Sequence, residues 1–214
     1  MEKTNLRIIG GEFRSRKIQF AVDPRTRPMK DRTREAVMNL LGGTLPESIA
    51  FDLFAGTGIL AFEALSRGSS AAILFEILRN ASQEILNNAK TLGLVENVVV
   101  IQNDVLRWTA SMEKNLPMLR LPELPWVVFC CPPYALWEEA PDDMRMLLQR
   151  WVELAPVGSL FAIELEEKTP LDFLPKDLEW DVRTYRPARM AIGEKYPANS
   201  QGEPVSESES DLES

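Results

Sequence analysis

The chain has 214 residues, of which 45% are hydrophobic, and these values predict one main domain with a substantial buried core. Histidine is absent, which excludes catalytic triads that need a histidine base and zinc sites built on histidine. We expect neither a membrane span, because no run of about 18 apolar residues occurs, nor a signal peptide. The only cysteines, Cys130 and Cys131, are adjacent, so we expect both to stay reduced in a cytoplasmic protein.

Charge is distributed unevenly along the chain. The net charge is −8, but residues 1–34 contain ten Lys or Arg and four acids, which leaves +6 in this segment and −14 in the remainder. Phosphate binding depends on such local clusters more than on the total charge. The segment therefore predicts either a surface that faces nucleic acid or a solvated basic surface, and both interpretations stay open. Residues 197–214 contain five acids and no base, which predicts a disordered acidic tail.

The predicted elements begin with a small basic hairpin, in which strands 6–9 and 17–20 flank Gly10 and Gly11. A helix follows from Asp31, its expected N-cap, to about residue 41, and Gly42 and Gly43 end it. These elements make up a predicted N-terminal extension, residues 1–45.

From residue 50 onward, predicted strands and helices alternate. The expected strands cover 50–54, 71–75, 98–101, 126–131 and 160–163, and the expected helices cover 59–67, 80–92 and 137–154, with a less regular segment up to residue 124. Short apolar strands separated by helices indicate a parallel sheet that is covered on both faces. Strands 180–185 and 188–192 are expected to form a closing hairpin. We assign residues 46–196 to this α/β domain.

The clearest functional signal is Phe51-Asp52-Leu53-Phe54-Ala55-Gly56-Thr57-Gly58, where an apolar strand runs into a glycine turn that opens a helix. Glycines there admit positive φ and let a ligand approach the backbone, while the N–H groups of the helix start face it. Glu76 ends the next strand, where folds of this kind place a carboxylate for ribose hydroxyls. Together these features predict a site for a nucleoside cofactor.

Two further strand ends carry candidate functional groups. Asp104 follows strand 98–101, where its carboxylate either accepts a hydrogen bond from an adenine amino group or only ends the strand as a turn residue. Cys131-Pro132-Pro133-Tyr134 lies at the end of strand 126–131. The prolines remove two N–H donors and stiffen the loop, and Tyr134 offers a flat ring on which an unstacked base can lie.

With these motifs the chain resembles the RsmD-type bacterial 16S rRNA (guanine-N2)-methyltransferases over about residues 6–193. The matching segments are Arg7-Ile8-Ile9-Gly10-Gly11, Arg27-Pro28 with Asp31-Arg32 and Arg34-Glu35, the glycine turn, Glu63-Ala64-Leu65-Ser66-Arg67-Gly68, Glu76, Asn103-Asp104 and Pro132-Pro133-Tyr134. The N-terminal Arg-Pro block is the part that is specific to this family, because many methyltransferases share the glycine turn.

The resemblance implies a seven-stranded, Rossmann-like α/β sheet that binds S-adenosylmethionine, with a small N-terminal β-hairpin extension. It implies methyl transfer to the exocyclic amine of a guanine in ribosomal RNA or a small-subunit assembly intermediate, without a metal. The implied cofactor-binding residues are Phe54, Gly56, Thr57, Gly58, Glu76 and Asp104, and the implied catalytic residues are Cys131, Pro132, Pro133 and Tyr134. The implied RNA-binding residues are Arg7, Arg14, Arg16, Lys17, Arg27, Arg32 and Arg34.

One departure from the family pattern bears on activity. The family has Asp or Asn where this chain has Cys131, and that residue accepts a hydrogen bond from the target amino group. A thiol is a weak acceptor, so the sequence predicts low or absent activity. Two alternatives stay open: an RNA-binding ribosome-assembly factor without turnover, and an NAD-dependent oxidoreductase, because Gly56-x-Gly58-x-x-Ala61 with Glu76 also satisfies the dinucleotide fingerprint.

Overall fold

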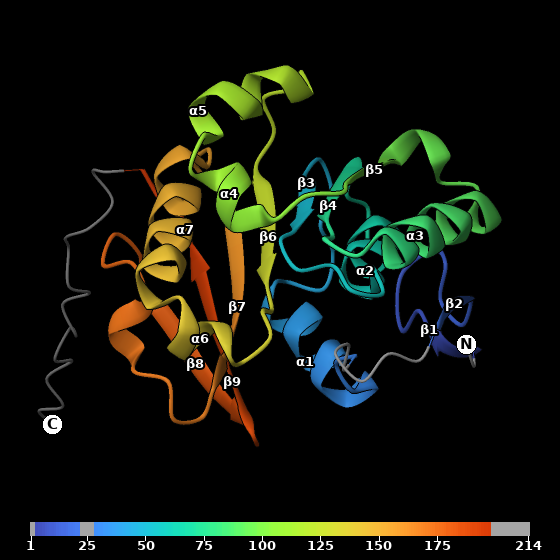
Figure 1. Cartoon of the computed structure of the whole chain (residues 1–214). Helices are drawn as coiled ribbons and strands as arrows, with labels where there is room; N and C mark the ends of the chain where they lie inside the picture. Colours follow the sequence, from blue (N-terminus) through green and yellow to red (C-terminus); the bar gives the residue numbers. More distant parts are fainter. Residues whose placement is uncertain (1–2, 22–27, 198–214) are drawn as a thin grey trace, which may run out of the picture.

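A seven-stranded sheet forms the centre of the protein in the computed structural model, which describes residues 3–21 and 28–197 (Figure 1). The strand order is β5-β4-β3-β6-β7-β9-β8, and the strands are parallel except for β9, which runs antiparallel to both of its neighbours. The strands are β3 (Ile49–Asp52), β4 (Ala71–Phe75), β5 (Val98–Ile101), β6 (Trp126–Cys130), β7 (Leu160–Glu166), β8 (Trp180–Tyr185) and β9 (Ala188–Glu194). The prediction of a seven-stranded α/β sheet is confirmed.

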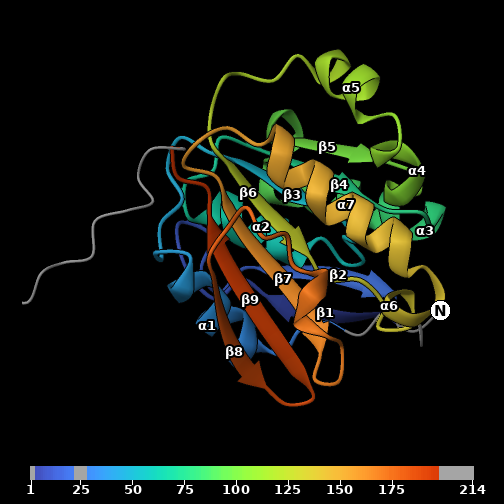
Figure 2. The ribbon, with the colours of Figure 1, turned by 90° about the vertical axis from the view of Figure 1, so that its left-hand side faces the viewer.

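Helices cover both faces of the sheet (Figure 2). One apolar cluster joins the sheet to α1 (Asp31–Leu40), α2 (Ile59–Ser66) and α3 (Arg79–Leu92). The other joins it to α4 (Val105–Thr109), α5 (Met112–Asn115), α6 (Leu136–Glu139) and α7 (Pro141–Leu154). Three short 3₁₀ turns complete the structure, at Val95–Asn97, Leu116–Leu119 and Leu171–Phe173. Among the helices of the described residues, none has the length and apolar character needed to cross a membrane.

Alternation along the strands explains why both faces are apolar. In β3, Ala50 packs on the side of α2, while Phe51 packs on the side of α7. The Phe51 ring centroid lies 4.9 Å from that of Trp126 and 4.9 Å from that of Trp151. Because both faces are buried, these strands are nearly continuous apolar runs, as the sequence indicates.

Two local predictions are wrong. The expected helix 137–154 is divided into α6 and α7, because Pro141 occupies the first turn of α7 and Ala140 before it has φ −138° and ψ 53°, outside the helical region. Asp31 does not cap α1: the N-cap is Lys30, without a side-chain bond, and Asp31 is the first helical residue. Its carboxylate accepts hydrogen bonds from two arginines instead.

The N-terminal hairpin is present and packs beside α3. Strands β1 (Lys3–Arg7) and β2 (Lys17–Ala21) pair antiparallel, so the first strand lies earlier in the chain than the expected 6–9 and leaves Ile8 and Ile9 outside it. The N–H of Gln19 donates to the Asn88 side chain at 2.9 Å, the Asn88 amide donates back to the Gln19 carbonyl at 2.7 Å, and the N–H of Ala21 donates to Glu84 at 2.8 Å. The expected acidic tail lies, apart from Pro197, outside the described residues.

Candidate functional site

The glycine turn lies between β3 and α2, at the carboxyl edge of the sheet. Gly56 has φ 52° and Gly58 has φ 74°, both in the left-handed region that glycine adopts without strain. A Cβ at Gly58 would lie 3.1–3.2 Å from side-chain atoms of Leu74, Ile85 and Phe62. Any other residue there would therefore strain the backbone and crowd the core, so this turn requires glycine at position 58.

Glu76 connects the end of β4 to the glycine turn. Its Oε2 accepts the N–H of Gly56 at 2.8 Å, and its Oε1 accepts the N–H of Leu78 at 2.7 Å. The residue is 8% exposed. The structure places its carboxylate against the turn, and the sequence prediction that it binds ribose hydroxyls stays a prediction.

Asp104 lies after β5 and caps α4. Its Oδ1 accepts the N–H of Leu106 at 2.9 Å, and its Oδ2 lies 3.9 Å from Nε of Arg107. The turn-residue role that the sequence left open is thus present. The carboxylate remains one-third exposed, so it keeps surface for a ligand, and its role towards adenine stays a prediction.

Sequence reasoning missed Ile77, which lies between Glu76 and Leu78 and is 62% exposed. Single exposed aliphatic side chains are common on protein surfaces, so only its place beside the Glu76 carboxylate makes Ile77 a candidate for contact with a ligand. The residue gave no signal in the sequence because an isoleucine after a strand reads as core until its exposure is known.

Asp52 is the second residue that sequence reasoning missed, since it reads there as part of an apolar strand. It is 1% exposed and lies below the glycine turn, at the end of β3. Among the described residues, neither carboxylate oxygen has a hydrogen-bond partner of good geometry. Burial and, to a smaller extent, the charge of Glu76 raise the pKa of Asp52 to about 7, while the backbone N–H groups of Phe54 and Ala61 oppose this rise.

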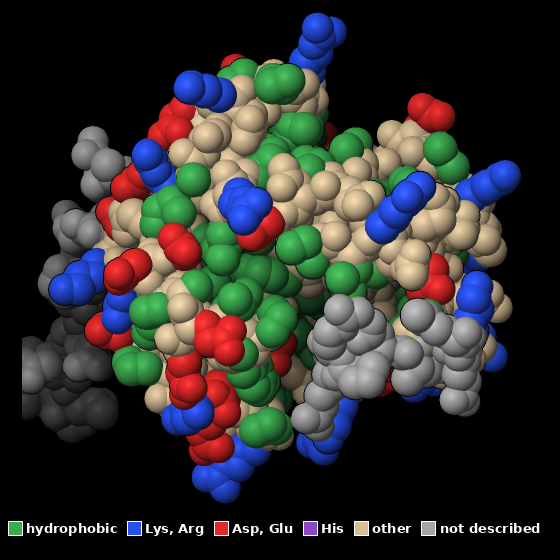
Figure 3. Space-filling view, in the orientation of Figure 1, with side chains coloured by type: hydrophobic (Ala, Val, Ile, Leu, Met, Phe, Trp, Pro, Cys, Tyr) green, Lys and Arg blue, Asp and Glu red, His purple; other side chains and the backbone are tan. Residues whose placement is uncertain are grey.

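The segment Cys131-Pro132-Pro133-Tyr134 follows β6, as predicted, and contacts a residue of β7. The Tyr134 hydroxyl donates a hydrogen bond to Oε1 of Glu164 at 2.7 Å. Burial first, and then the negative charge of Glu164, raise the pKa of the half-buried Cys131 thiol well above its usual range. On the face of the molecule shown in Figure 1 and Figure 3, hydrophobic side chains gather in the middle, over β6 and the loop to α6, with charged side chains mainly around them.

Among the described residues, those predicted to bind RNA fall into three groups. Arg7, Arg14, Lys17 and Arg32 are exposed, and Arg7 also pairs with Asp31 at 2.8 Å. Arg16 is exposed but donates to the carbonyls of Thr91 and Leu92 at the end of α3. Arg27 lies outside the described residues.

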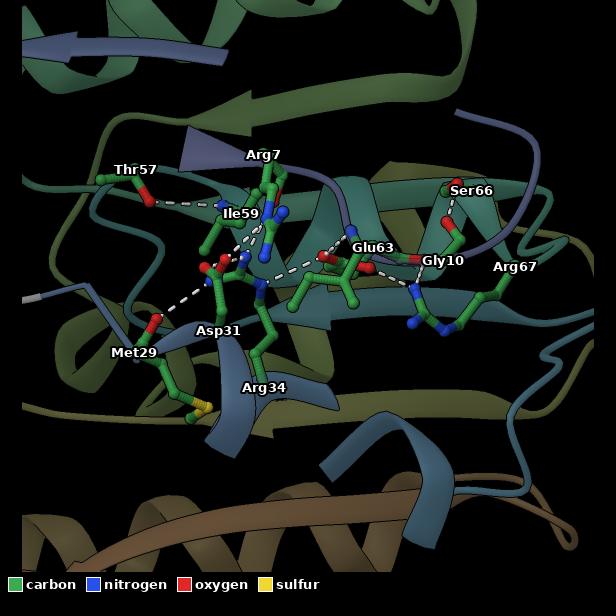
Figure 4. Close-up of polar contacts among 11 residues, drawn as sticks. Arg7, Gly10, Met29, Asp31, Arg34, Thr57, Ile59, Glu63, Ser66 and Arg67 are labelled. Atoms are coloured by element: carbon green, nitrogen blue, oxygen red, sulfur yellow. Dashed lines mark hydrogen bonds and ion pairs between the residues drawn. The ribbon is translucent and has the colours of Figure 1, made fainter. Parts of the chain in front are cut away.

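Arg34 forms the third group, and the expectation that it faces RNA is wrong for its side chain, which is 0% exposed. Its Nε donates to Oε1 of Glu63 at 3.0 Å, and its other nitrogens bind Asp31 and the carbonyls of Arg7 and Met29 (Figure 4). Glu63 is also fully buried, accepts the N–H of Ile9 at 2.7 Å and pairs with Arg67. The charge of Arg34 is compensated by buried Glu63 inside the protein. Through this ion pair Arg34 attaches the N-terminal extension to α2.

Two further observations concern metal binding and the position of a pocket. Within residues 3–21 and 28–197, His, Cys, Asp and Glu side chains form no group of three or more that could hold a metal ion. A pocket of about 440 Å³ lies between α7 and residues 172–177, and none of the candidate site residues lines it.

Comparison with known proteins identifies relatives over nearly the whole chain. The model of the family described as conserved hypothetical protein 95 matches residues 6–186. Ribosomal RNA small subunit methyltransferase D of Escherichia coli K12 is 30% identical over 92% of this chain and 92% of its own length. The protein of the same name from Buchnera aphidicola of Acyrthosiphon pisum is 31% identical over 82% of this chain and 85% of its own length.

Solved structures show the same fold. A candidate methyltransferase from Escherichia coli has a TM-score of 0.71 at 24% identity, covering 90% of this chain and 99% of its own. A candidate methylase from Haemophilus influenzae has a TM-score of 0.67 at 23% identity, covering 91% of this chain and 100% of its own.

Proposed function

The chain belongs to the family of RsmD-type ribosomal RNA methyltransferases, and from this premise we propose that it transfers a methyl group from S-adenosylmethionine to small-subunit ribosomal RNA in the cytoplasm. One observation carries the proposal: the glycine turn after β3 lies between two sets of functional groups. Glu76 and Asp104 end β4 and β5 on one side of β3, and Pro132-Pro133-Tyr134 follows β6 on the other. A cofactor on the first set and a base on the second would meet over the turn.

The residues at the turn fit S-adenosylmethionine. We propose that Phe54, Gly56, Thr57 and Gly58 hold its methionine end, that Glu76 accepts from the ribose hydroxyls, and that Asp104 accepts from the adenine amino group. Exposed Ile77 offers an apolar surface for the adenine ring. When bound, this cofactor supplies a methyl carbon on a positively charged sulfur, already activated for transfer.

The chain's own part in the reaction is to align the acceptor base. We propose that the acceptor is the exocyclic amine of a guanine, that the ring of Tyr134 stacks on this base, and that Pro132 and Pro133 stiffen the loop that carries it. Alignment of the amine with the methyl carbon and exclusion of water provide most of the rate enhancement in such a transfer. The absence of histidine is compatible with this chemistry.

We propose that residues 1–45 form the RNA-facing extension of a methyltransferase domain at residues 46–196. The exposed basic side chains of the extension, Arg7, Arg14, Lys17 and Arg32, support this proposal. Arg16 contributes its charge to the same surface while it holds the end of α3, and Arg27 stays in the proposal on its position in the sequence alone. No observation favours turnover with NAD over methyl transfer.

Cofactor binding tests the proposal directly. Calorimetry should show that S-adenosylmethionine binds and that NAD does not, and Glu76→Ala should weaken the binding by about 1–3 kcal/mol through the loss of charge-assisted hydrogen bonds. Glu123→Gln, which removes a carboxylate from an exposed loop, is the matched control and should bind as the native protein does. Tighter binding of NAD, or equal affinity in Glu76→Ala and native protein, would contradict the proposed site.

A further inference from the structure

Glu164 of β7 lies beside Cys131 at the carboxyl edge of the sheet. Strands β6 and β7 pair in parallel with Phe129 opposite Ala162 and Cys130 opposite Ile163, so the register continues with Cys131 beside Glu164. Ala162 packs on the face of the sheet that α2 covers, and Ile163 and Leu165 pack on the other face. Since side chains alternate along a strand, Glu164 projects to the α2 face, as Cys131 does.

The same register places this pair next to the glycine turn. Asp52 of β3 is opposite Phe129 of β6, so the turn that follows β3 begins beside the end of β6, which Cys131 follows. The N–H of Leu53 donates to the Phe129 carbonyl at 3.0 Å and keeps the two chains together beyond the strand. The turn, Cys131 and Glu164 therefore form a row at the edge where the proposed base and cofactor meet.

Hydrogen bonding identifies which group in this row can accept. Burial raises the pKa of the Cys131 thiol, so the sulfur carries its proton at neutral pH and acts as a weak S–H donor. Oε1 of Glu164 already accepts the Tyr134 hydroxyl at 2.7 Å. The Cys131 thiol is a second donor to this side chain. A carboxylate has about four acceptor positions, so Glu164 can accept further hydrogen bonds from a base that lies on Tyr134.

We propose that Glu164 is the hydrogen-bond acceptor for the amine that receives the methyl group, a catalytic role that rests on the proposed function. Its carboxylate turns the amine so that the nitrogen lone pair faces the methyl carbon. The lone pair forms the nitrogen–carbon bond, and the carbon–sulfur bond breaks with its electron pair remaining on sulfur. The surplus proton on nitrogen passes to the Glu164 carboxylate and from there to water. The acceptor thus comes from the strand next to the proline loop, and Cys131 does not have to supply it.

Single-turnover methyl transfer to small-subunit ribosomal RNA, at saturating S-adenosylmethionine, tests this role. Glu164→Gln keeps the shape of the side chain but removes its charge, and should lower the rate on the order of tenfold or more, the effect of losing a charge-assisted hydrogen bond in the transition state. Calorimetry on the same variant should show unchanged affinity for S-adenosylmethionine. Adding Cys131→Asp to Glu164→Gln should restore most of the rate, because it places a carboxylate at the neighbouring register position.

Tyr134→Phe separates this role from a structural one, since it removes the hydroxyl that binds Glu164 and keeps the ring. We expect it to lower the rate by no more than about threefold, well below the effect of Glu164→Gln. Equal losses in Tyr134→Phe and Glu164→Gln would show that Glu164 only orients the ring, and an unaltered rate in Glu164→Gln would also overturn the proposal. A native protein that is inactive until Cys131→Asp is introduced would overturn it while supporting the methyltransferase function. Inactivity of both proteins would contradict the proposed function itself.

Discussion

Arg32 and Arg34 lie two positions apart on α1 in opposite environments. Arg32 is exposed, whereas Arg34 is 0% exposed and pairs with the equally buried Glu63. Removing one partner of a buried pair leaves the other charge uncompensated in the interior. Both residues read as parts of one basic segment in the sequence, because the partner that distinguishes them is 29 positions away in the chain.

Substitution of these two arginines should therefore affect different properties of the protein. We expect Arg34→Ala to lower the free energy of unfolding by about 3–5 kcal/mol. Arg32→Ala should alter stability by no more than about 0.5 kcal/mol but weaken RNA binding. Urea unfolding and RNA titration of both variants are the measurements. If the arginine at position 34 can be removed without loss of stability, the structural role of its pair with Glu63 is wrong.

Asp52 predicts a pH dependence of stability. Its pKa is about 7 in the folded protein, against the ordinary value of 3.8 for an exposed aspartate, so the folded state holds the proton more tightly. The stabilisation from this residue is therefore complete below about pH 3.8 and is lost as the pH rises to about 7. Asp52→Asn lacks this loss, and its stability relative to the native protein should rise by up to roughly 4 kcal/mol between these limits.

Urea unfolding at several pH values checks this expectation, with Glu123→Gln as the exposed control. A parallel pH dependence in native protein and Asp52→Asn would show that the Asp52 carboxyl group is ionised without cost in the folded state.

For helices and strands, the sequence predicts well which segments form them. It predicts poorly which side chains of different elements contact one another. Strands 71–75 and 98–101 have the bounds that their apolar runs indicate, and Gly42 and Gly43 end α1 as expected. The division between α6 and α7 was missed because the apolar periodicity continues through it, although Pro141 was the available signal. The docking of β2 on α3 depends on Asn88 and Glu84, polar helix residues that carry no such signal in the sequence.

The hairpin should carry much of the affinity for RNA. Exchange of Arg14 and Lys17 for glutamine should weaken RNA binding and reduce the slope of log affinity against log salt by about one to two units, since two phosphate contacts are lost. Lys114→Gln with Arg120→Gln removes two exposed charges from the opposite region of the chain and serves as the matched control. Equal slopes in the two double variants would mean that the hairpin is only a solvated basic surface.

At the scale of the whole molecule, the site arises from the order of the strands. Strand β3 is central to the site because β4 pairs with it on one side and β6 on the other, which brings the glycine turn between Glu76 and the proline loop. The sequence indicates the strand ends that carry these groups, and the family resemblance implies how they are arranged. Asp52 and Glu164 emerge only from the structure, because their meaning depends on burial and on register between strands that are far apart in the chain.

The central claim is that this chain methylates a guanine of small-subunit ribosomal RNA. Its most direct test is incubation of native protein with S-adenosylmethionine and either protein-free RNA or small-subunit particles, followed by nuclease digestion and mass spectrometry of the nucleosides. We expect N2-methylguanosine to accumulate with native protein and Tyr134→Ala to abolish it, because the target base loses its stacking surface. No methylated nucleoside with either RNA, or a methyl group on a base other than guanine, would contradict it.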